Sequence, residues 1–319
     1  MGAVRGLRGD RLWVWGVRGW WAALPFTAGP VLADALHETS PSWRSTSSLG
    51  LWVLWALVLV GILLAHPVTL VLVRLALPSA VAALVWAGLG GAGWDEVALV
   101  AAITAAVAAA SLSAPVGQVL VNGISYGDEI RLLLRPPAML VAGPVPAAAA
   151  ITVGGLLSGP LLLAAEHWVA GVVITVVGGL LAVVGARSLY SLTRRWLVFV
   201  PAGVVIHDHL AVQDPLLLRR RVVAVLGPAP QGSDQGSDTV DLSTGAAPQE
   251  SDTVDLSMGA AGLILELAMT QPITLTPPTR RANRATGDTS TGDIKTTAVL
   301  IAPSRPGLAT TLARQRLTG

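Results

Sequence analysis

The stretch RRWLVFVPAGVVIHDH, residues 194–209, follows a long apolar run and decides where the membrane part of this chain ends. Two short runs rich in β-branched and aromatic residues flank a Pro-Ala-Gly turn signal. Each run is only about five residues long, whereas a helix needs about 20 apolar residues to cross a bilayer. The pattern therefore predicts a β-hairpin, and we expect the soluble part of the chain to begin near residue 188.

The composition upstream of this stretch is typical of a membrane protein. The chain has 319 residues, of which 53% are hydrophobic and 13% are charged, whereas soluble domains have about 25% charged residues. The absence of cysteine excludes disulfides, thiolate chemistry and Cys-based zinc sites. The net charge of +2 is too small to indicate a nucleic-acid partner. We expect no cofactor and no bound metal.

Hydropathy predicts five transmembrane helices, and a shorter apolar segment precedes them. The expected spans, after a cytoplasmic segment at 1–19, are 20–36, 49–65, 68–90, 97–117, 138–164 and 168–186. The first of these is short and contains two prolines and Asp34. Three interpretations of it remain open: it spans the membrane, it lies in the interface, or it is a signal peptide cleaved near Ala35. We expect the break between the second and third spans at His66-Pro67, because proline is tolerated in a first helical turn.

The distribution of arginine predicts the orientation of these spans. With the N-terminus inside, the outside loops carry a single arginine, Arg44. The short inside segments carry nine: Arg5, Arg8, Arg11, Arg18, Arg131, Arg135, Arg187, Arg194 and Arg195. Because basic residues favour the cytoplasmic side, we expect a multi-pass protein of the cell membrane with a cytoplasmic C-terminus.

Residues 188–319 are expected to form a soluble, mainly β domain. Beyond the hairpin, short apolar runs predict strands at 216–218, 221–226, 263–268, 273–276 and 296–302. The fourth is expected to pair with the third through a turn at Thr270-Gln271-Pro272. An amphipathic helix is expected at 308–317, and the polar stretches 228–251 and 277–295 are expected to be flexible loops. The predicted fold class is a bundle of five to six transmembrane helices followed by this domain.

The polar stretch contains an internal duplication. SDTVDLSTGAA at 237–247 recurs as SDTVDLSMGAA at 251–261. Two short copies cannot stack a solenoid core. Because the second copy continues into an apolar strand and the first continues into Pro248, we expect the first copy to loop out and only the second to pair.

The stretches RRWLVFVPAGVVIHD and RRRVVAVLG, followed by further strands and a last helix, resemble the pleckstrin-homology-like (PH-like) modules of bacterial membrane proteins. The whole chain also resembles an uncharacterised family of actinobacterial integral membrane proteins. LPFTAGPVLADAL, VNGISYGDEIRLLLRPP and GPVP carry this second resemblance. The resemblance implies a PH-like fold for the C-terminal domain and no particular reaction.

Residues 121–137 form the richest polar patch near the predicted membrane. As weak candidates for binding a ligand or partner we identify Asn122, Tyr126, Asp128, Glu129, Arg131 and Arg135. The alternative is that these charges pair with one another or with headgroups. Basic residues near the soluble domain are candidates for contact with anionic lipid: Arg194, Arg195, Arg219, Arg220 and Arg221. The alternative for the run at 219–221 is a charged strand edge.

Three further residues have an ionisable side chain that invites a functional interpretation. His207 and His209 alternate around Asp208, so both imidazoles of a strand could share a metal. A polar hairpin end is the simpler interpretation. Arg74 lies within a predicted span, where an ionisable group is a functional candidate by default. The simpler interpretation is that its long side chain reaches the headgroup region.

No nucleophile, base and orienting group can be assembled from these motifs, so we do not expect an enzyme. The leading hypothesis is a membrane-anchored interaction or scaffold protein. Its expected partners are the lipid bilayer together with anionic headgroups or a cytoplasmic protein bound through 188–319. The alternative hypothesis is a small transporter or channel subunit formed by the helical bundle.

Overall fold

The computed structural model describes residues 2–91, 93–230, 239–241, 252–278 and 293–317. The chain divides into two compact units. The helical unit comprises Gly2–Ile124 and Pro144–Thr193. The β unit comprises Ser125–Gly143 and Arg194–Gly319. Long apolar helices followed by a C-terminal region with two sheets confirm the predicted fold class.

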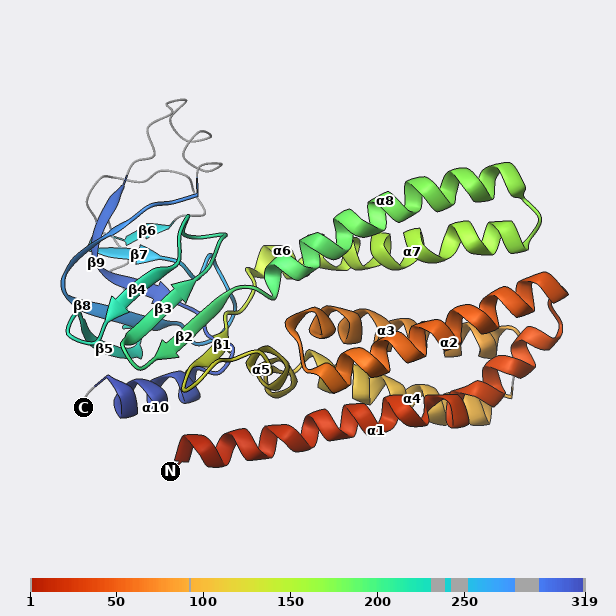
Figure 1. Ribbon diagram of the computed structural model, residues 1–319, viewed down its shortest axis with the longest axis horizontal. Helices are drawn as coiled ribbons and strands as arrows, with labels where there is room; N and C mark the ends of the chain where they lie inside the picture. Colours follow the sequence, from red (N-terminus) through yellow and green to blue (C-terminus); the bar gives the residue numbers. More distant parts are fainter. Residues whose placement is uncertain (1, 92, 231–238, 242–251, 279–292, 318–319) are drawn as a thin grey trace. The chain divides into compact units, whose positions relative to one another are not determined.

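The helical unit contains five helices that are long and apolar enough to cross a membrane (Figure 1). They are α2 (Pro41–Leu64), α3 (Pro67–Leu89), α4 (Trp94–Leu112), α7 (Pro144–Ala164) and α8 (Trp168–Leu192). The predicted break between α2 and α3 is present. The Nδ1 atom of His66 accepts a hydrogen bond from the Val68 amide at 3.2 Å, and Pro67 occupies the first turn of α3.

Two of these helices have ends that differ from the predicted spans. α4 stops at Leu112, and a separate short helix, α5 (Ala114–Asn122), follows Ser113. Proline in the first turn of α5 suits a new helix, because its missing N–H would have no partner there. α7 begins at Pro144, later than the predicted residue 138, because Gly143 is not helical. Residues Ala138–Ala142 form a separate short helix, α6, within the β unit.

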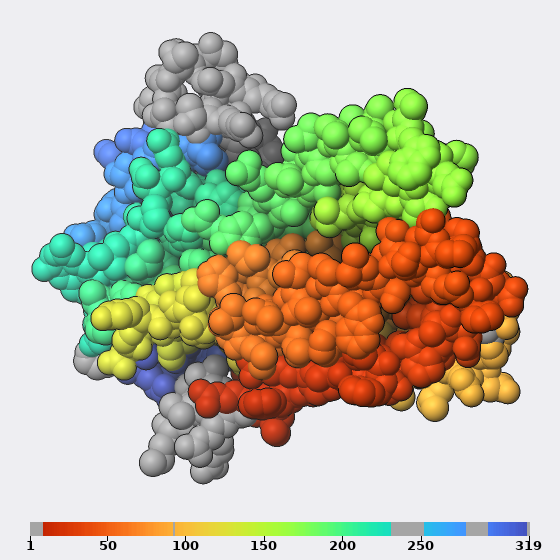
Figure 2. Space-filling view, turned by 45° about the vertical axis from the view of Figure 1, so that its right-hand side comes forward, coloured from red at the N-terminus to blue at the C-terminus, as the bar shows by residue number. Residues whose placement is uncertain are grey.

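The segment before α2 forms one long helix, α1 (Gly2–His37), which includes both the predicted segment 1–19 and the predicted span 20–36. It is not among the five long apolar helices, yet it packs against α2, α3, α4 and α5. The Trp21 indole donates to the Trp55 carbonyl at 2.9 Å, and the Trp55 indole donates to the Trp21 carbonyl at 2.9 Å. The red α1 and the orange α2 form a continuous surface in Figure 2. Tryptophan bonding therefore fixes α1 to the bundle.

The hairpin of α7 and α8 depends on glycine. A Cβ atom at Gly159 would lie 2.5 Å from the Cα and 2.6 Å from the backbone nitrogen of Thr175. The backbones of α7 and α8 are also close at Gly155 and Gly178, where a Cβ atom on Gly178 would lie 3.1 Å from the Gly155 Cα. Small residues let two helix backbones approach closely in a membrane, and here they set the distance between α7 and α8.

The first sheet of the β unit has the order β1-β2-β3-β4, with every pair antiparallel. Its strands are β1 (Ile130–Leu133), β2 (Trp196–Val200), β3 (Gly203–His207) and β4 (Leu216–Arg219). The hairpin of β2 and β3 agrees with the opening prediction. β1 was not predicted, since it lies in the connection between the expected spans 97–117 and 138–164, and it pairs with β2 through Leu133 opposite Trp196.

The second sheet has the order β5-β8-β9-β7-β6. Its strands are β5 (Val223–Pro228), β6 (Thr239–Asp241), β7 (Thr253–Asp255), β8 (Leu265–Leu275) and β9 (Ile294–Ile301). The turn expected at Thr270-Gln271-Pro272 is wrong. Both halves of β8 continue along β9, with a shift in register between Ala268 and Ile273. Proline cannot donate to a ladder, so it marks an irregularity of one strand here rather than a reversal.

The expectation that the first repeat copy loops out is also wrong. β6 comes from the first copy and β7 from the second, and they pair in parallel with Thr239 opposite Thr253 and Asp241 opposite Asp255. β7 in turn pairs with β9. Identical sequences form equivalent strands, so the duplication adds a strand to the edge of the sheet. The predicted flexibility of 228–251 and 277–295 falls mainly on residues outside the described parts of the chain.

A final helix, α10 (Pro306–Arg316), closes the β unit and packs against β5 and β2. Its inward residues Ala309, Leu312 and Ala313 are buried. The Arg316 guanidinium donates to the carbonyl oxygens of Phe199 and Asp128. The core between the sheets and this helix is apolar, and it includes fully buried Leu197, Phe199, Ile206 and Val299.

Candidate functional site

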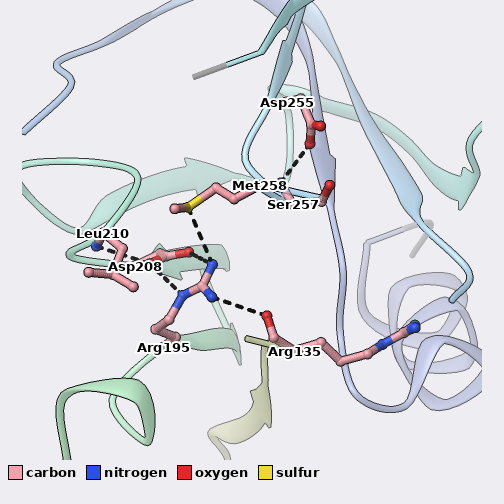
Figure 3. A network of polar contacts seen from close by, with 7 residues as sticks. All are labelled: Arg135, Arg195, Asp208, Leu210, Asp255, Ser257 and Met258. Atoms are coloured by element: carbon pink, nitrogen blue, oxygen red, sulfur yellow. Dashed lines mark hydrogen bonds and ion pairs between the residues drawn. The ribbon is translucent and has the colours of Figure 1, made fainter. Parts of the chain in front are cut away.

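The most concentrated polar site in the β unit is an ion pair between Arg195 and Asp208 (Figure 3). Arg195 directly precedes β2 and Asp208 directly follows β3. Because Trp196 pairs with His207, the hairpin register places these two residues opposite each other. Nε of Arg195 donates to Oδ1 of Asp208 at 2.8 Å, and Nη2 donates to Oδ2 at 2.6 Å. The side chains are 1% and 0% exposed, so the pair is bidentate and closed to solvent.

The remaining donors and acceptors of this pair are used by other segments of the β unit. Nη1 of Arg195 donates to the Arg135 carbonyl at 3.1 Å, and Nη2 lies 3.8 Å from the Met258 sulfur. Oδ1 of Asp208 also accepts from the Leu210 amide at 3.1 Å. Figure 3 shows these contacts converging from distant parts of the sequence. Full satisfaction is what a buried charged pair requires.

Arg135 forms a second clamp in the β unit. Its Nε donates to the Pro303 carbonyl at 3.0 Å, its Nη2 donates to the Leu263 carbonyl at 2.7 Å, and its Nη1 donates to the Ala261 carbonyl. Its own amide donates to the Ala302 carbonyl at 2.7 Å. The guanidinium thus holds the strand preceding α6 against the loops that flank β8 and β9. Burial lowers the pKa of Arg135, yet arginine stays charged at physiological pH.

A stack of three side chains lies on the other face of the first sheet. The imidazole of His207 stacks on the Trp196 indole with ring centroids 5.4 Å apart. The Arg131 guanidinium lies over the same indole, 4.8 Å from its centroid. Arg131 is also paired with Glu129 at 2.6 Å. These three stacked side chains and the Glu129 carboxylate that pairs with Arg131 form a group that we call the Trp196 stack.

His207, a member of this stack, and the nearby His209 both have a pKa below the ordinary value of 6.5. Partial burial lowers the pKa of His207, and the nearby charges of Arg194, His209 and Arg131 lower it further, while Asp208 raises it. Partial burial is also the main cause that lowers the pKa of His209. Asp208, which lies between them in sequence, is turned inward to Arg195. Within the described residues, no group of three or more His, Asp or Glu is placed to hold a metal ion.

The candidates from 121–137 are mostly engaged within the protein. Asn122 ends α5 and donates to the Gln118 carbonyl at 2.8 Å. Glu129 accepts from the Tyr126 amide at 2.8 Å as well as from Arg131. The carbonyl of Asp128 accepts from Arg316. The Tyr126 side chain is 91% exposed. The alternative interpretation, in which these charges pair with one another, describes Glu129 and Arg131.

The lipid-contact candidates do not form one surface. Arg195 is buried in its ion pair, so this expectation is corrected: its guanidinium has no access to headgroups. Arg219, Arg220 and Arg221 are exposed. Arg219 pairs with Gly203, at the first residue of β3. Arg194 lies close to the other end of β3, because Trp196 of β2 pairs with His207 there. Four strand positions separate these ends, which is about 13 Å.

Sequence reasoning missed the two roles that matter most in this unit, the partner of Arg195 and the clamp formed by Arg135. A usable signal exists for the first. Once a hairpin is centred on residues 201–202, Arg195 and Asp208 are equidistant from the turn. No comparable signal points to the carbonyl groups that Arg135 binds, because they lie more than a hundred residues further along the chain.

Comparisons with family models, with curated proteins and with solved structures found no match to this chain.

Proposed function

We propose that this integral membrane protein is a membrane-anchored interaction protein whose β unit is PH-like, faces the cytoplasm and binds a protein partner with an acidic surface. The five long apolar helices support the membrane location. The buried ion pair and the Arg135 clamp are saturated by contacts within the protein, so they serve the fold. The exposed charges are what remains for recognition.

The observation that carries this proposal is the discontinuous β unit. The chain passes between the helical and β units after Ile124, after Gly143 and after Thr193. Three segments of the chain therefore tether the β unit to the membrane-spanning helices. A binding surface tethered in this way stays with the membrane-spanning part of the protein, as an interaction protein at the membrane requires.

The partner surface that we favour is the basic run Arg219, Arg220 and Arg221. All three side chains are exposed. Within the described residues, none of the three forms an ion pair, so no carboxylate neutralises this run. Leu217 precedes Arg219 by two positions on β4, shares its face of the strand and is 47% exposed. Exposed guanidinium groups beside an apolar side chain suit a partner that combines carboxylates with an apolar contact.

The positive charge bias of the sequence supports the cytoplasmic orientation. The PH-like assignment is supported by an antiparallel sheet of four strands, a second sheet and a closing helix in this order along the chain. Lys295 provides a simple check, since it is the single lysine of the chain and is exposed. An amine reagent that does not cross membranes is expected to leave Lys295 unmodified in intact cells and to modify it after permeabilisation.

The proposed interaction is tested with the full chain reconstituted in nanodiscs of neutral lipid. The triple variant Arg219→Glu, Arg220→Glu, Arg221→Glu is compared with Arg314→Glu, an exposed charge reversal on α10. We expect cytosolic proteins recovered by the unaltered chain to be lost in the triple variant and retained in the control, with recovery falling at high salt. Equal recovery by both variants, or no cytosolic protein recovered by the unaltered chain, would overturn the proposed protein partner.

A further inference from the structure

The helix α3 lies inside the helical unit. It packs against α1, α2, α4, α5, α7 and α8. Its most buried residues recur every three or four positions, so they lie on one side of the helix. Leu70, Leu77 and Leu84 on this side are each 0% exposed. Arg74 lies four residues after Leu70 and three before Leu77, so it lies on the same side of α3, where the residue as a whole is partly exposed.

Arg74 has no partner among the described residues. Its Nε atom is buried and forms no hydrogen bond. The ion pairs Arg131–Glu129 and Arg195–Asp208 both lie in the β unit. By contrast, Arg18 on α1 donates to the Ile62 carbonyl from both Nε, at 3.2 Å, and Nη2, at 2.8 Å. The helical unit therefore satisfies one arginine through its own backbone and leaves another unsatisfied.

The depth of Arg74 makes this lack of a partner expensive. Arg74 follows Pro67 by seven residues, which is about 10 Å along a helix, in a hydrocarbon layer about 30 Å thick. Arginine remains protonated, and a charged side chain at the centre of a span costs about 2.5–3.5 kcal/mol on insertion scales, and less nearer the ends, unless it is compensated. A compensating negative group is therefore expected at this position.

The neighbouring helix supplies no such group. Gly88 of α3 meets the Trp94 ring of α4, which fixes the antiparallel pairing of these two helices. Arg74 lies fourteen residues before Gly88 on α3, and Ala108 lies fourteen residues after Trp94 on α4. In an antiparallel pair these two positions lie at the same level. Residues 105–110 of α4 are AAVAAA, and their short side chains offer no acceptor. The group that compensates Arg74 therefore does not come from the stretch of α4 level with it.

We propose that Arg74 anchors a binding site for an oxyanion, the phosphate or carboxylate group of a ligand, within the helical unit. The guanidinium presents paired N–H donors whose geometry matches two oxygens of such a group. The phosphate of an anionic lipid and a free anion share this chemistry. The site goes beyond the proposed partner surface on the β unit and does not depend on it.

The experiment uses the full chain in neutral detergent. Thermal unfolding is followed while inorganic phosphate, acetate or phosphatidylglycerol is added, each against a control of equal ionic strength with chloride or of phosphatidylcholine. A ligand that binds the folded chain raises the unfolding temperature with concentration. Arg74→Gln removes the charge and Arg74→Lys keeps the charge without the paired donors. Arg44→Gln, an exposed arginine at the start of α2, is the control.

We expect at least one probe to stabilise the unaltered chain and Arg44→Gln equally, and to bind Arg74→Gln at least about tenfold more weakly, the loss of one charged hydrogen bond. Stabilisation by phosphatidylglycerol alone identifies lipid phosphate, and stabilisation by phosphate or acetate identifies a free anion. If Arg74→Gln does not fold, Arg74→Lys carries the test through the same loss of affinity. No stabilisation by any probe, or equal stabilisation of the Arg74 variants, would overturn the site.

Discussion

The carboxylate of Asp208 binds the guanidinium of Arg195, and neither side chain reaches solvent. The two residues lie opposite each other, one position beyond the last pair of the β2–β3 hairpin. Removing one partner leaves the other charge buried alone. We expect Asp208→Asn to lower the free energy of unfolding by about 3–5 kcal/mol. The measurement is denaturant unfolding of the full chain in micelles, with hydrogen exchange of residues 196–207 reporting on the β unit.

Replacing both partners gives the sharper test of this pair. In the double variant Arg195→Met, Asp208→Leu no charge is left buried, so we expect much of the lost stability to return. Asp214→Asn, at an exposed carboxylate of the same unit, is the control and is expected to have little effect. A double variant as unstable as the sum of the single variants would show that the pair does not act as a unit.

The reciprocal bonds between Trp21 and Trp55 predict that α1 is stably packed in the bundle. Trp21→Phe keeps an aromatic ring and removes one donor. We expect it to lower the free energy of unfolding by about 0.6 kcal/mol through the lost hydrogen bond, and further through the smaller ring at a position that is 2% exposed. Trp13→Phe on the same helix, where the side chain is 55% exposed, should have no effect. Equal effects of the two substitutions would argue against the bond.

The glycine contacts predict a strong difference between two alanine substitutions on α7. A Cβ at Gly159 would overlap the backbone of Thr175, whereas a Cβ at Gly154 meets nothing within 4 Å. We expect Gly159→Ala to separate α7 from α8 and to cost about 1–3 kcal/mol. Gly154→Ala should be neutral or slightly stabilising, since alanine favours a helix. Thermal unfolding of both variants in micelles compares them, and similar unfolding temperatures would contradict the close packing.

His207 is expected to titrate below its ordinary pKa of 6.5, mainly because of burial and then because of Arg194. The folded state then binds fewer protons than the unfolded state as pH falls below about 6.5, so acid should lower the stability of the β unit from that pH downward. NMR of ¹³C-labelled histidine, assigned with His207→Gln, measures the pKa directly. Arg194→Gln removes a cation and should raise it. A pKa of His207 at or above 6.5 in the unaltered chain would contradict the environment described for the Trp196 stack.

Some features of the fold follow from short stretches of sequence. The break at His66-Pro67 combines a capping imidazole with a proline in the next turn, and both act within a few residues. The hairpin of residues 196–207 is likewise set by two β-branched runs and the turn between them. The strand at Ile130–Leu133 was missed because polar turn signals precede it and its partner lies more than sixty residues away in β2.

The same distinction explains the errors in the second sheet. Pro272 and the residues before it carry a turn signal, but pairing with β9 on both sides keeps β8 as one strand. The first repeat copy carries a loop signal in Pro248, but its Thr239–Asp241 segment finds an identical strand beside which it can pair. In both cases, hydrogen bonding to a distant strand outweighed the local preference.

The sequence by itself determined that the chain crosses a membrane, approximately where its helices lie, and that a β region follows, because apolar length and alternation are properties of neighbouring residues. Only the tertiary structure decided that residues 125–143 belong to the β unit, that Arg195 is buried against Asp208, and that Arg74 has no partner among the residues that the structure describes. These features depend on which distant groups meet. An arginine has the same charge in every context, and its surroundings in the folded chain decide whether it binds a carboxylate, a carbonyl or a ligand.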